Sequence, residues 1–158
     1  MSSKMTAQDH IQGVGAVLTN LLGLETVVRI FIAHSHKQIL SLPDPVDQSA
    51  KETYLTNFRS LGSLIDEYNG LLAESEGQFR ISRDVVDIRD SFAHGRLLSV
   101  GDVYPATLYK FGIARDGEVP IQFRYVLAND WLNEVKLRIR DEQIRVINCH
   151  KARGYPGF

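Results

Sequence analysis

The chain has 158 residues, of which 44% are hydrophobic, and this is enough apolar material for the core of one domain spanning residues 1–158. Its formal net charge of −1 gives no general attraction to nucleic acid or membranes, so anion binding would need a local basic cluster. The single cysteine, Cys149, excludes an internal disulfide and a multi-cysteine zinc site.

The first predicted element is a helix over about residues 11–33. Its apolar residues recur at helical spacing in two adjacent stripes, so both sides must be covered, one of them by a second subunit. Gly23 predicts a break or kink in this helix. The stripes are Ile11, Val14, Leu18, Leu21, Val28 and Ile32, beside Val17, Leu24, Val27 and Phe31.

The N-terminal segment predicts a soluble protein. Residues 1–10 lack the apolar stretch of a signal peptide. Asn20, Glu25 and Arg29 would make residues 11–33 costly in lipid. We therefore expect a cytoplasmic protein with no membrane partner.

Residues 41–50, with two prolines, predict a loop. The next predicted helix covers residues 54–72, where large apolar residues follow a 4-3-4-3-4 spacing. These residues are Tyr54, Phe58, Leu61, Ile65, Tyr68 and Leu72.

After a polar link at residues 74–78, a third helix is predicted over residues 81–94. Ile81, Val85, Ile88 and Phe92 lie on one face of it. Gly95 follows, where a left-handed C-cap is expected.

The sequence then changes to alternating polar and apolar residues, which predict a β-hairpin over about residues 107–127, with an Asp-Gly turn at residues 116–117. A last helix is predicted over about residues 129–151, starting at Asn129. The predicted fold class is therefore mainly α, an antiparallel helical bundle with a β-hairpin inserted before the last helix.

The end of the third helix carries unusual polar chemistry. The stretch "VVDIRDSFAHGRLLS", residues 85–99, places Arg89, Asp90 and His94 on the sector beside the apolar stripe. Arg89 and His94 are roughly 140° apart on a helix, so they converge only if the last turn unwinds, the arginine folds over or a second copy faces the first.

The segment "RDSFAHG" resembles the R-x4-6-H motif of HEPN domains, a family of small helical bundles. Arg89 matches the motif arginine, Asp90 the polar residue after it and His94 the histidine. The resemblance covers roughly residues 10–100 and the last helix, and the hairpin lies outside it.

The resemblance implies a homodimer that cleaves RNA without metal or cofactor and leaves a 2′,3′-cyclic phosphate. In this chemistry the RNA 2′-hydroxyl is the nucleophile. His94 would take or give a proton, Arg89 would hold the phosphate, and Asp90 would orient one of them. Ser91 points elsewhere on the helix and is the weaker candidate.

The family also includes toxins, and an antitoxin or a nucleotidyltransferase would then be a partner. Arg96 stands where some of these toxins carry a modified tyrosine, which argues against that form of control. Further weak RNA contacts are predicted for Arg96 and for basic residues of the last helix. These are Arg138, Arg140 and Arg145.

Two other functions stay open, a non-catalytic RNA- or nucleotide-binding module of HEPN type and a protein-interaction scaffold. In the simplest alternative, Arg89 pairs with a nearby carboxylate and His94 caps the helix. No zinc pair is expected from His34 and His36, because residues two apart diverge on a helix, and His150 is expected to stand alone.

Overall fold

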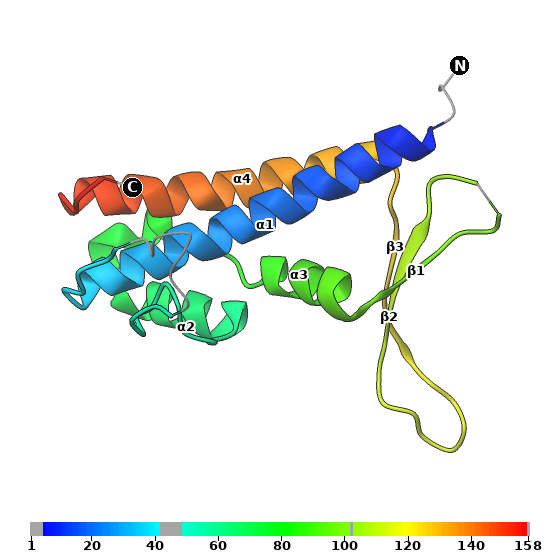
Figure 1. The fold of residues 1–158 in the computed structure, drawn as a ribbon, viewed down its shortest axis with the longest axis horizontal. Coiled ribbons are helices and arrows are strands. Elements are labelled where there is room, and N and C mark those ends of the chain that lie inside the picture. Colours follow the sequence, from blue (N-terminus) through cyan, green and yellow to red (C-terminus); the bar gives the residue numbers. More distant parts are fainter. Residues whose placement is uncertain (1–4, 42–48, 102, 158) are drawn as a thin grey trace. The chain divides into compact units, whose positions relative to one another are not determined.

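The computed structural model describes residues 5–41, 49–101 and 103–157, which are mainly helical, as predicted (Figure 1). The predicted loop at residues 41–50 lies largely outside them. In chain order the elements are α1 (Ala7–Ser35), α2 (Leu61–Leu71), the 3-10 helix η1 (Glu74–Phe79), α3 (Asp84–His94), β1 (Arg96–Leu98), β2 (Thr107–Phe111), β3 (Ile121–Val126) and α4 (Asn129–Ala152).

The chain forms two compact units, and α1 and α4 each contribute to both. The first unit comprises Met1–Leu21 and Asp84–Ile139, and so contains the start of α1, all of α3, the sheet and the start of α4. The second comprises Leu22–Arg83 and Arg140–Phe158, with α2, η1 and the remainder of the two long helices.

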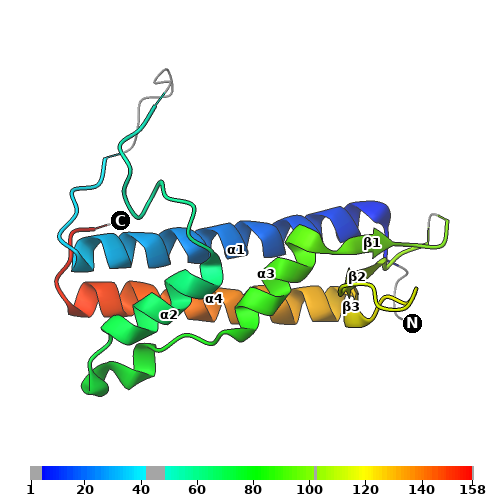
Figure 2. The same cartoon turned by 90° about the horizontal axis from the view of Figure 1, so that it is seen from below.

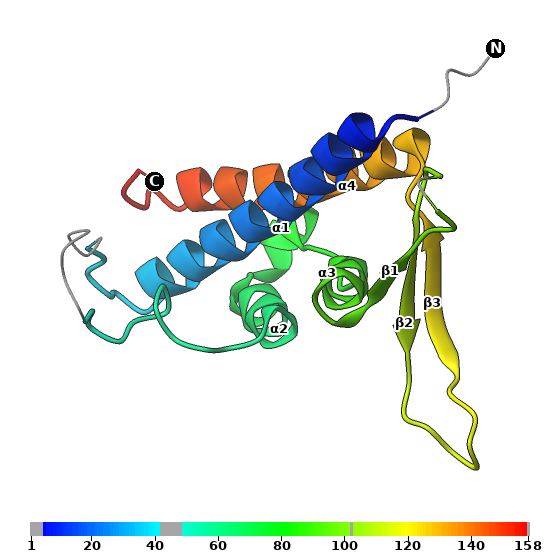
Figure 3. The same cartoon turned by 45° about the vertical axis from the view of Figure 1, so that its right-hand side comes forward.

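The first unit is built around α3 and a three-stranded antiparallel sheet of order β1-β2-β3. Figure 3 shows α3 lying beside β2. Val85 and Ile88 of α3 and Leu108 of β2 are buried, as are Leu127 and Leu132 around the start of α4. The apolar stripe predicted for α3 therefore faces the core of this unit.

The predicted hairpin is confirmed. Strands β2 and β3 pair from Thr107↔Val126 to Phe111↔Ile121, with a bulge between Lys110 and Phe111. Its Asp116 and Gly117 have φ values of 52° and 82°, the left-handed conformation that a two-residue Asp-Gly turn adopts.

Strand β1 was not predicted, because three residues are too short to show an alternating pattern. It follows α3 almost directly and pairs with β2 through Arg96↔Tyr109, Leu97↔Leu108 and Leu98↔Thr107. The hairpin thus gains a third strand, which connects it to the end of α3.

In the second unit, η1 follows α2 closely along the chain (Figure 2). Helix α2 packs on α1, where the rings of Tyr68 and Phe31 meet edge to face with centroids 4.7 Å apart, and Glu76 of η1 bonds to Arg153 just after α4. Ser60 caps α2, and its hydroxyl accepts a hydrogen bond from the Ser63 amide. The core of this unit is aromatic and aliphatic. Its fully buried residues include Leu24, Val28, Phe31, Ile32, Leu61, Leu64, Ile65, Tyr68 and Val146.

The helix predicted over residues 54–72 begins only at Leu61, so the prediction for residues 54–60 was wrong. The guanidinium of Arg29 accounts for the difference. It donates hydrogen bonds to the backbone carbonyls of Tyr54, Asn57 and Arg59, at 2.8 to 3.1 Å. These carbonyls are thereby fixed in an irregular turn, and Phe58 is left fully exposed.

Helix α3 also begins later than predicted, at Asp84 rather than at residue 81. The side chain of Asn69 explains this start. Its amide oxygen accepts from the Ile81 amide at 3.0 Å, and its amide nitrogen donates to the Ile81 carbonyl at 2.9 Å. Ile81 is buried, but its backbone is bonded to α2 instead of to a helix of its own.

Helix α1 is continuous through Gly23, so the predicted break does not occur. Glycine is instead used for close approach between helices. A Cβ on Gly23 would lie 2.3 Å from Nε2 of Gln143, and one on Gly13 would lie 2.7 Å from Cδ1 of Leu132. Both partners belong to α4.

In each unit α1 and α4 run parallel, which differs from the predicted antiparallel bundle. In the second unit Gly23 faces Gln143 and His34 faces His150, so numbers rise in the same direction along both helices. In the first unit both helices begin at the same end (Figure 1). The chain returns through β1, β2 and β3 before α4 starts, and this excursion permits the parallel pairing.

Helix α1 is long and apolar enough to cross a membrane, and among the described residues it is the one helix with both properties. In its most apolar window 44% is buried inside the protein. A core helix of a soluble protein has the same properties.

Candidate functional site

The polar motif lies on the last two turns of α3, in the first unit. Ser91 is buried, and its hydroxyl donates to the Asp87 carbonyl at 2.7 Å. This bond turns the Ser91 side chain into the helix, as its predicted direction implied. The neighbouring Arg89 and Asp90 are half-buried.

Arg89 and Asp90 form an ion pair, with 2.9 Å between Nη1 of Arg89 and Oδ1 of Asp90. The second carboxylate oxygen of Asp90 lies 4.0 Å from Nζ of Lys110 in β2. The Nε of Arg89 is buried and has no hydrogen-bond partner among the described residues. One carboxylate therefore lies between two cations, and the buried Nε donor of the arginine is unpaired.

His94, the last residue of α3, is exposed. Its backbone carbonyl accepts a hydrogen bond from the guanidinium of Arg96 at 3.2 Å, and so does the Gly95 carbonyl. Within the described part of the chain, no hydrogen bond or ion pair joins its imidazole to Arg89 or Asp90. A single copy thus brings Arg89 and Asp90 together and leaves His94 separate.

Gly95 does not adopt the predicted left-handed conformation. The glycine instead lets the backbone at residue 95 pack closely against two carbonyl oxygens. An added Cβ would lie 2.1 Å from the Ser91 carbonyl oxygen and 2.8 Å from that of Tyr109. The amide of Gly95 also donates to the Ser91 carbonyl at 2.8 Å. The glycine therefore allows α3 to pass directly into β1 against β2.

The arginines predicted as weak RNA contacts divide between the two units. Arg96 and Arg138 are exposed in the first unit, and Arg140 and Arg145 are exposed in the second. Arg145 donates to the Arg80 carbonyl at 3.2 Å.

Lys110 also belongs to this cluster, although the sequence did not predict it. Its ammonium lies near Asp90 and also 5.4 Å from the ring centroid of Phe123. No local sequence pattern predicts that Lys110 lies near Asp90, because this contact depends on how α3 and β2 pack. Its place in an alternating strand was the one available signal.

A second pair was also missed, His34 and His150 in the second unit. Their ring nitrogens lie 2.8 Å apart, and His150 is 1% exposed. Burial, with a smaller effect from His34, lowers the pKa of His150 below its ordinary value. His34 also lines a cavity of about 460 Å³ with Ile30, Ile39 and Leu55. The expectation that His150 stands alone was wrong.

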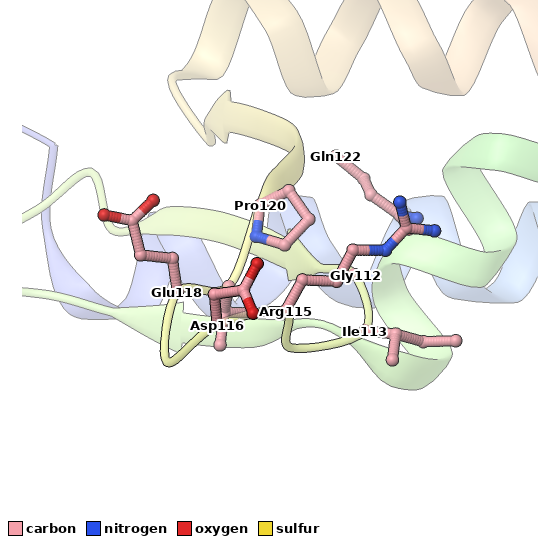
Figure 4. Close-up of a pocket in the computed structure, with 8 residues that line it drawn as sticks. Gly112, Ile113, Arg115, Asp116, Glu118, Pro120 and Gln122 are labelled. Carbon is pink, nitrogen blue, oxygen red and sulfur yellow. The ribbon is translucent and has the colours of Figure 1, made fainter.

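A cavity of about 680 Å³ lies in the hairpin tip between Gly112 and Gln122. Figure 4 shows the side chains of Arg115 and Glu118 pointing to opposite sides of this turn. Its lining is almost entirely exposed, so it lacks the buried polar groups of a ligand site.

Among residues 5–41, 49–101 and 103–157, no group of three histidine, cysteine, aspartate or glutamate side chains is placed to hold a metal ion. No family model, no curated protein and no solved structure matches the chain.

Proposed function

We propose that the chain is a HEPN-type endoribonuclease that needs no metal, with Arg89 and His94 as catalytic residues. The observation that carries the proposal is the 2.9 Å pair of Arg89 and Asp90, little more than one turn before an exposed His94. A fixed cation and an accessible imidazole are the two groups that cleavage of an RNA phosphodiester requires.

In the proposed reaction the ribose 2′-hydroxyl attacks the adjacent phosphorus while its proton passes to a base. The bond from phosphorus to the 5′-oxygen breaks, and that oxygen takes a proton from an acid. The products are a 2′,3′-cyclic phosphate and a 5′-hydroxyl. His94 is the base or the acid, and Arg89 binds the phosphate oxygens as negative charge gathers on them. Asp90 is a positioning residue that acts through Arg89.

The proposal includes a homodimer, because Arg89 and His94 of one copy do not meet and a second copy supplies the missing partner. Two exposed apolar residues of α1 in the same unit support this, Ile11 at 67% and Leu18 at 40% exposure. They are seven residues apart and lie on one helix face. Gly15 between them would let a second helix approach closely, since nothing lies within 4 Å of its Cβ position.

A second function is a module of the same type that binds RNA without cleaving it. It is favoured by the ion pair itself, because Asp90 neutralises Arg89 and also approaches Lys110. It is favoured as well by the separation of His94 from both. A cytoplasmic location and an antitoxin or nucleotidyltransferase partner are further parts of the proposal that depend on which function holds.

The decisive test is cleavage of single-stranded RNA by the purified chain in EDTA. We expect cutting with cyclic-phosphate ends, and a loss of about 100-fold or more for His94→Ala and for Arg89→Gln. Arg80→Gln is the matched control, because it removes one exposed arginine of the other unit. Thermal unfolding of each variant shows whether the fold is retained.

If the folded wild type binds RNA but cuts none, and His94→Ala binds equally well, the binding module is the correct function. The dimer is tested separately by sedimentation. Leu18→Lys should shift the protein to monomer and lower the cleavage rate, whereas a monomeric wild type that cuts RNA would contradict the shared site.

A further inference from the structure

The two faces of the sheet have different surroundings. On one face, Leu108 is 4% exposed, Lys110 approaches Asp90 of α3, and the ring of Tyr125 stacks on Trp131 of α4 at 4.9 Å. Residues of this face therefore pack on the helices of the first unit. Because side chains alternate along a strand, the residues between them lie on the other face.

That other face carries a row of three residues, one from each strand. The register pairs Arg96 of β1 with Tyr109 of β2, and Tyr109 with Arg124 of β3. Directly opposed residues point to the same side of a sheet. Both arginines are exposed and Tyr109 is half-buried between them. We call these three residues, together with Phe111 of β2, the Arg-Tyr-Arg row.

Two aromatic rings of the Arg-Tyr-Arg row lie nearly parallel to each other. Tyr109 and Phe111 have centroids 5.9 Å apart and planes only 8° from parallel. The guanidinium carbon of Arg124 lies 5.8 Å from the centroid of Tyr109. Phe111 is 41% exposed. Parallel exposed rings are the groups on which nucleic-acid bases stack, and arginine adds both stacking and phosphate contacts.

A cavity of about 420 Å³ adjoins the row and includes Tyr109 in its lining. Its other walls include Leu98 and Thr107, which share this face, and Val100, Val103 and Pro105 from the connection between β1 and β2. Its volume is in the range of small-ligand sites, and its walls are mostly apolar, as a site for a planar base requires.

The charge of this face favours an anionic occupant. Neither Arg96 nor Arg124 has a carboxylate within ion-pair distance among the described residues, and the rows of this face contain no acidic side chain. A second copy docked face to face would bring four arginines together without compensation. The charge therefore favours nucleic acid over a second copy.

We propose that the Arg-Tyr-Arg row and the adjoining cavity form a binding surface for single-stranded RNA. A single strand leaves its bases free to stack on Tyr109 and Phe111, which a duplex does not. Arg96 and Arg124 then contact the phosphates on either side. The choice of RNA rests on the proposed function, and Arg96 is two residues from His94, which connects this surface to the candidate catalytic residues.

The test measures binding by the full chain of a fluorescent oligoribonucleotide whose 2′-hydroxyls are methylated, so that 2′-hydroxyl attack is blocked. We expect Tyr109→Leu and Arg124→Gln each to weaken binding about tenfold. Arg124→Gln should also reduce the slope of log affinity against log salt by about 0.7, as for one phosphate contact on a single strand. Arg80→Gln is the control, and Tyr109→Phe, which keeps the ring, should bind more tightly than Tyr109→Leu.

Unchanged affinity in folded Tyr109→Leu and Arg124→Gln would overturn the surface, as would a wild type that does not bind the oligonucleotide. A self-association that is lost in Tyr109→Leu, without RNA binding, would overturn it in favour of a second copy. Cleavage of unmodified RNA is scored separately. If Tyr109→Leu weakens RNA binding and the wild type cuts no RNA, the binding surface is supported and the nuclease proposal is rejected. If the wild type cuts RNA and Tyr109→Leu cuts it equally well, the nuclease proposal is supported and the binding surface is rejected.

Discussion

The guanidinium of Arg153 and the carboxylate of Glu76 form two hydrogen bonds, of 2.9 and 2.6 Å, which join the residue after α4 to η1. The same guanidinium donates to the Leu71 carbonyl at 2.7 Å and lies 4.9 Å from the ring centroid of Phe31. The hydrogen bonds from Arg153 lower the pKa of Glu76 to about 2. Arg153 therefore joins the C-terminal end of α4 to η1 and to the end of α2 within the second unit.

Replacing this carboxylate should destabilise the protein. We expect Glu76→Gln to lower the free energy of unfolding by about 2 kcal/mol, as for hydrogen bonds to a charged group. Because the folded pKa lies below the ordinary 4.5, the pair contributes fully above about pH 4.5 and its contribution is lost as pH falls toward 2. Urea unfolding at pH 6 and pH 3 measures both effects, and Glu74→Gln, on the exposed side of η1, is the control.

The buried histidine of the second unit should make stability depend on pH near neutrality. Burial lowers the folded pKa of His150 below 6.5, so the unfolded chain binds a proton first as pH falls. We expect the free energy of unfolding to be largest above about pH 6.5 and to fall as pH drops below it. His150→Gln should flatten this profile.

A residual slope in His150→Gln is expected from His10, whose pKa is also lowered by burial. The prediction is contradicted if wild type and His150→Gln lose stability in parallel over this range.

The close packing at Gly95 predicts a large effect of a single methyl group. Gly95→Ala would place its Cβ against two backbone oxygens that cannot move independently, so we expect a loss of at least about 2 kcal/mol. Gly70→Ala, inside α2 with nothing within 4 Å, should instead raise stability by about 0.5–1 kcal/mol. Thermal unfolding of both variants tests this contrast, and equal shifts would contradict it.

The contacts of Arg29 predict a local effect. Arg29→Met keeps much of the apolar stem but removes the donors to the carbonyls of Tyr54, Asn57 and Arg59. Amide hydrogen exchange should then speed up across residues 53–60, and limited proteolysis should cut there first. Exchange at the buried end of α2, near Tyr68, should change less, and uniform acceleration would point to global destabilisation instead.

The elements that the sequence predicted well are those with local causes. The hairpin follows from alternation and an Asp-Gly turn, and the helix that starts at Asn129 follows from its strong helix formers. The start of α2 was missed because Phe58 fits a helical spacing, while a side chain from another helix, Arg29, determines the backbone there. A contact between distant segments thus overrode a local periodicity.

The same distinction applies to the candidate site. Arg89, Asp90 and His94 were found because they lie within six residues on one helix. Lys110 comes from a strand, and His34 and His150 are 116 positions apart, so no spacing rule could have joined them. Their proximity depends on helix pairing, which the sequence pattern does not encode locally.

The parallel course of α1 and α4 has an electrostatic consequence. Aligned peptide dipoles give both helices a partial positive charge at their N-termini and a partial negative charge at their C-termini. Asp9 and Asp130 in the first turns, and Lys151 in the last turn of α4, have the signs that offset this polarity. Two helix N-termini therefore belong to the unit that carries Arg96 and Arg124, and each is offset there by an aspartate of its own first turn.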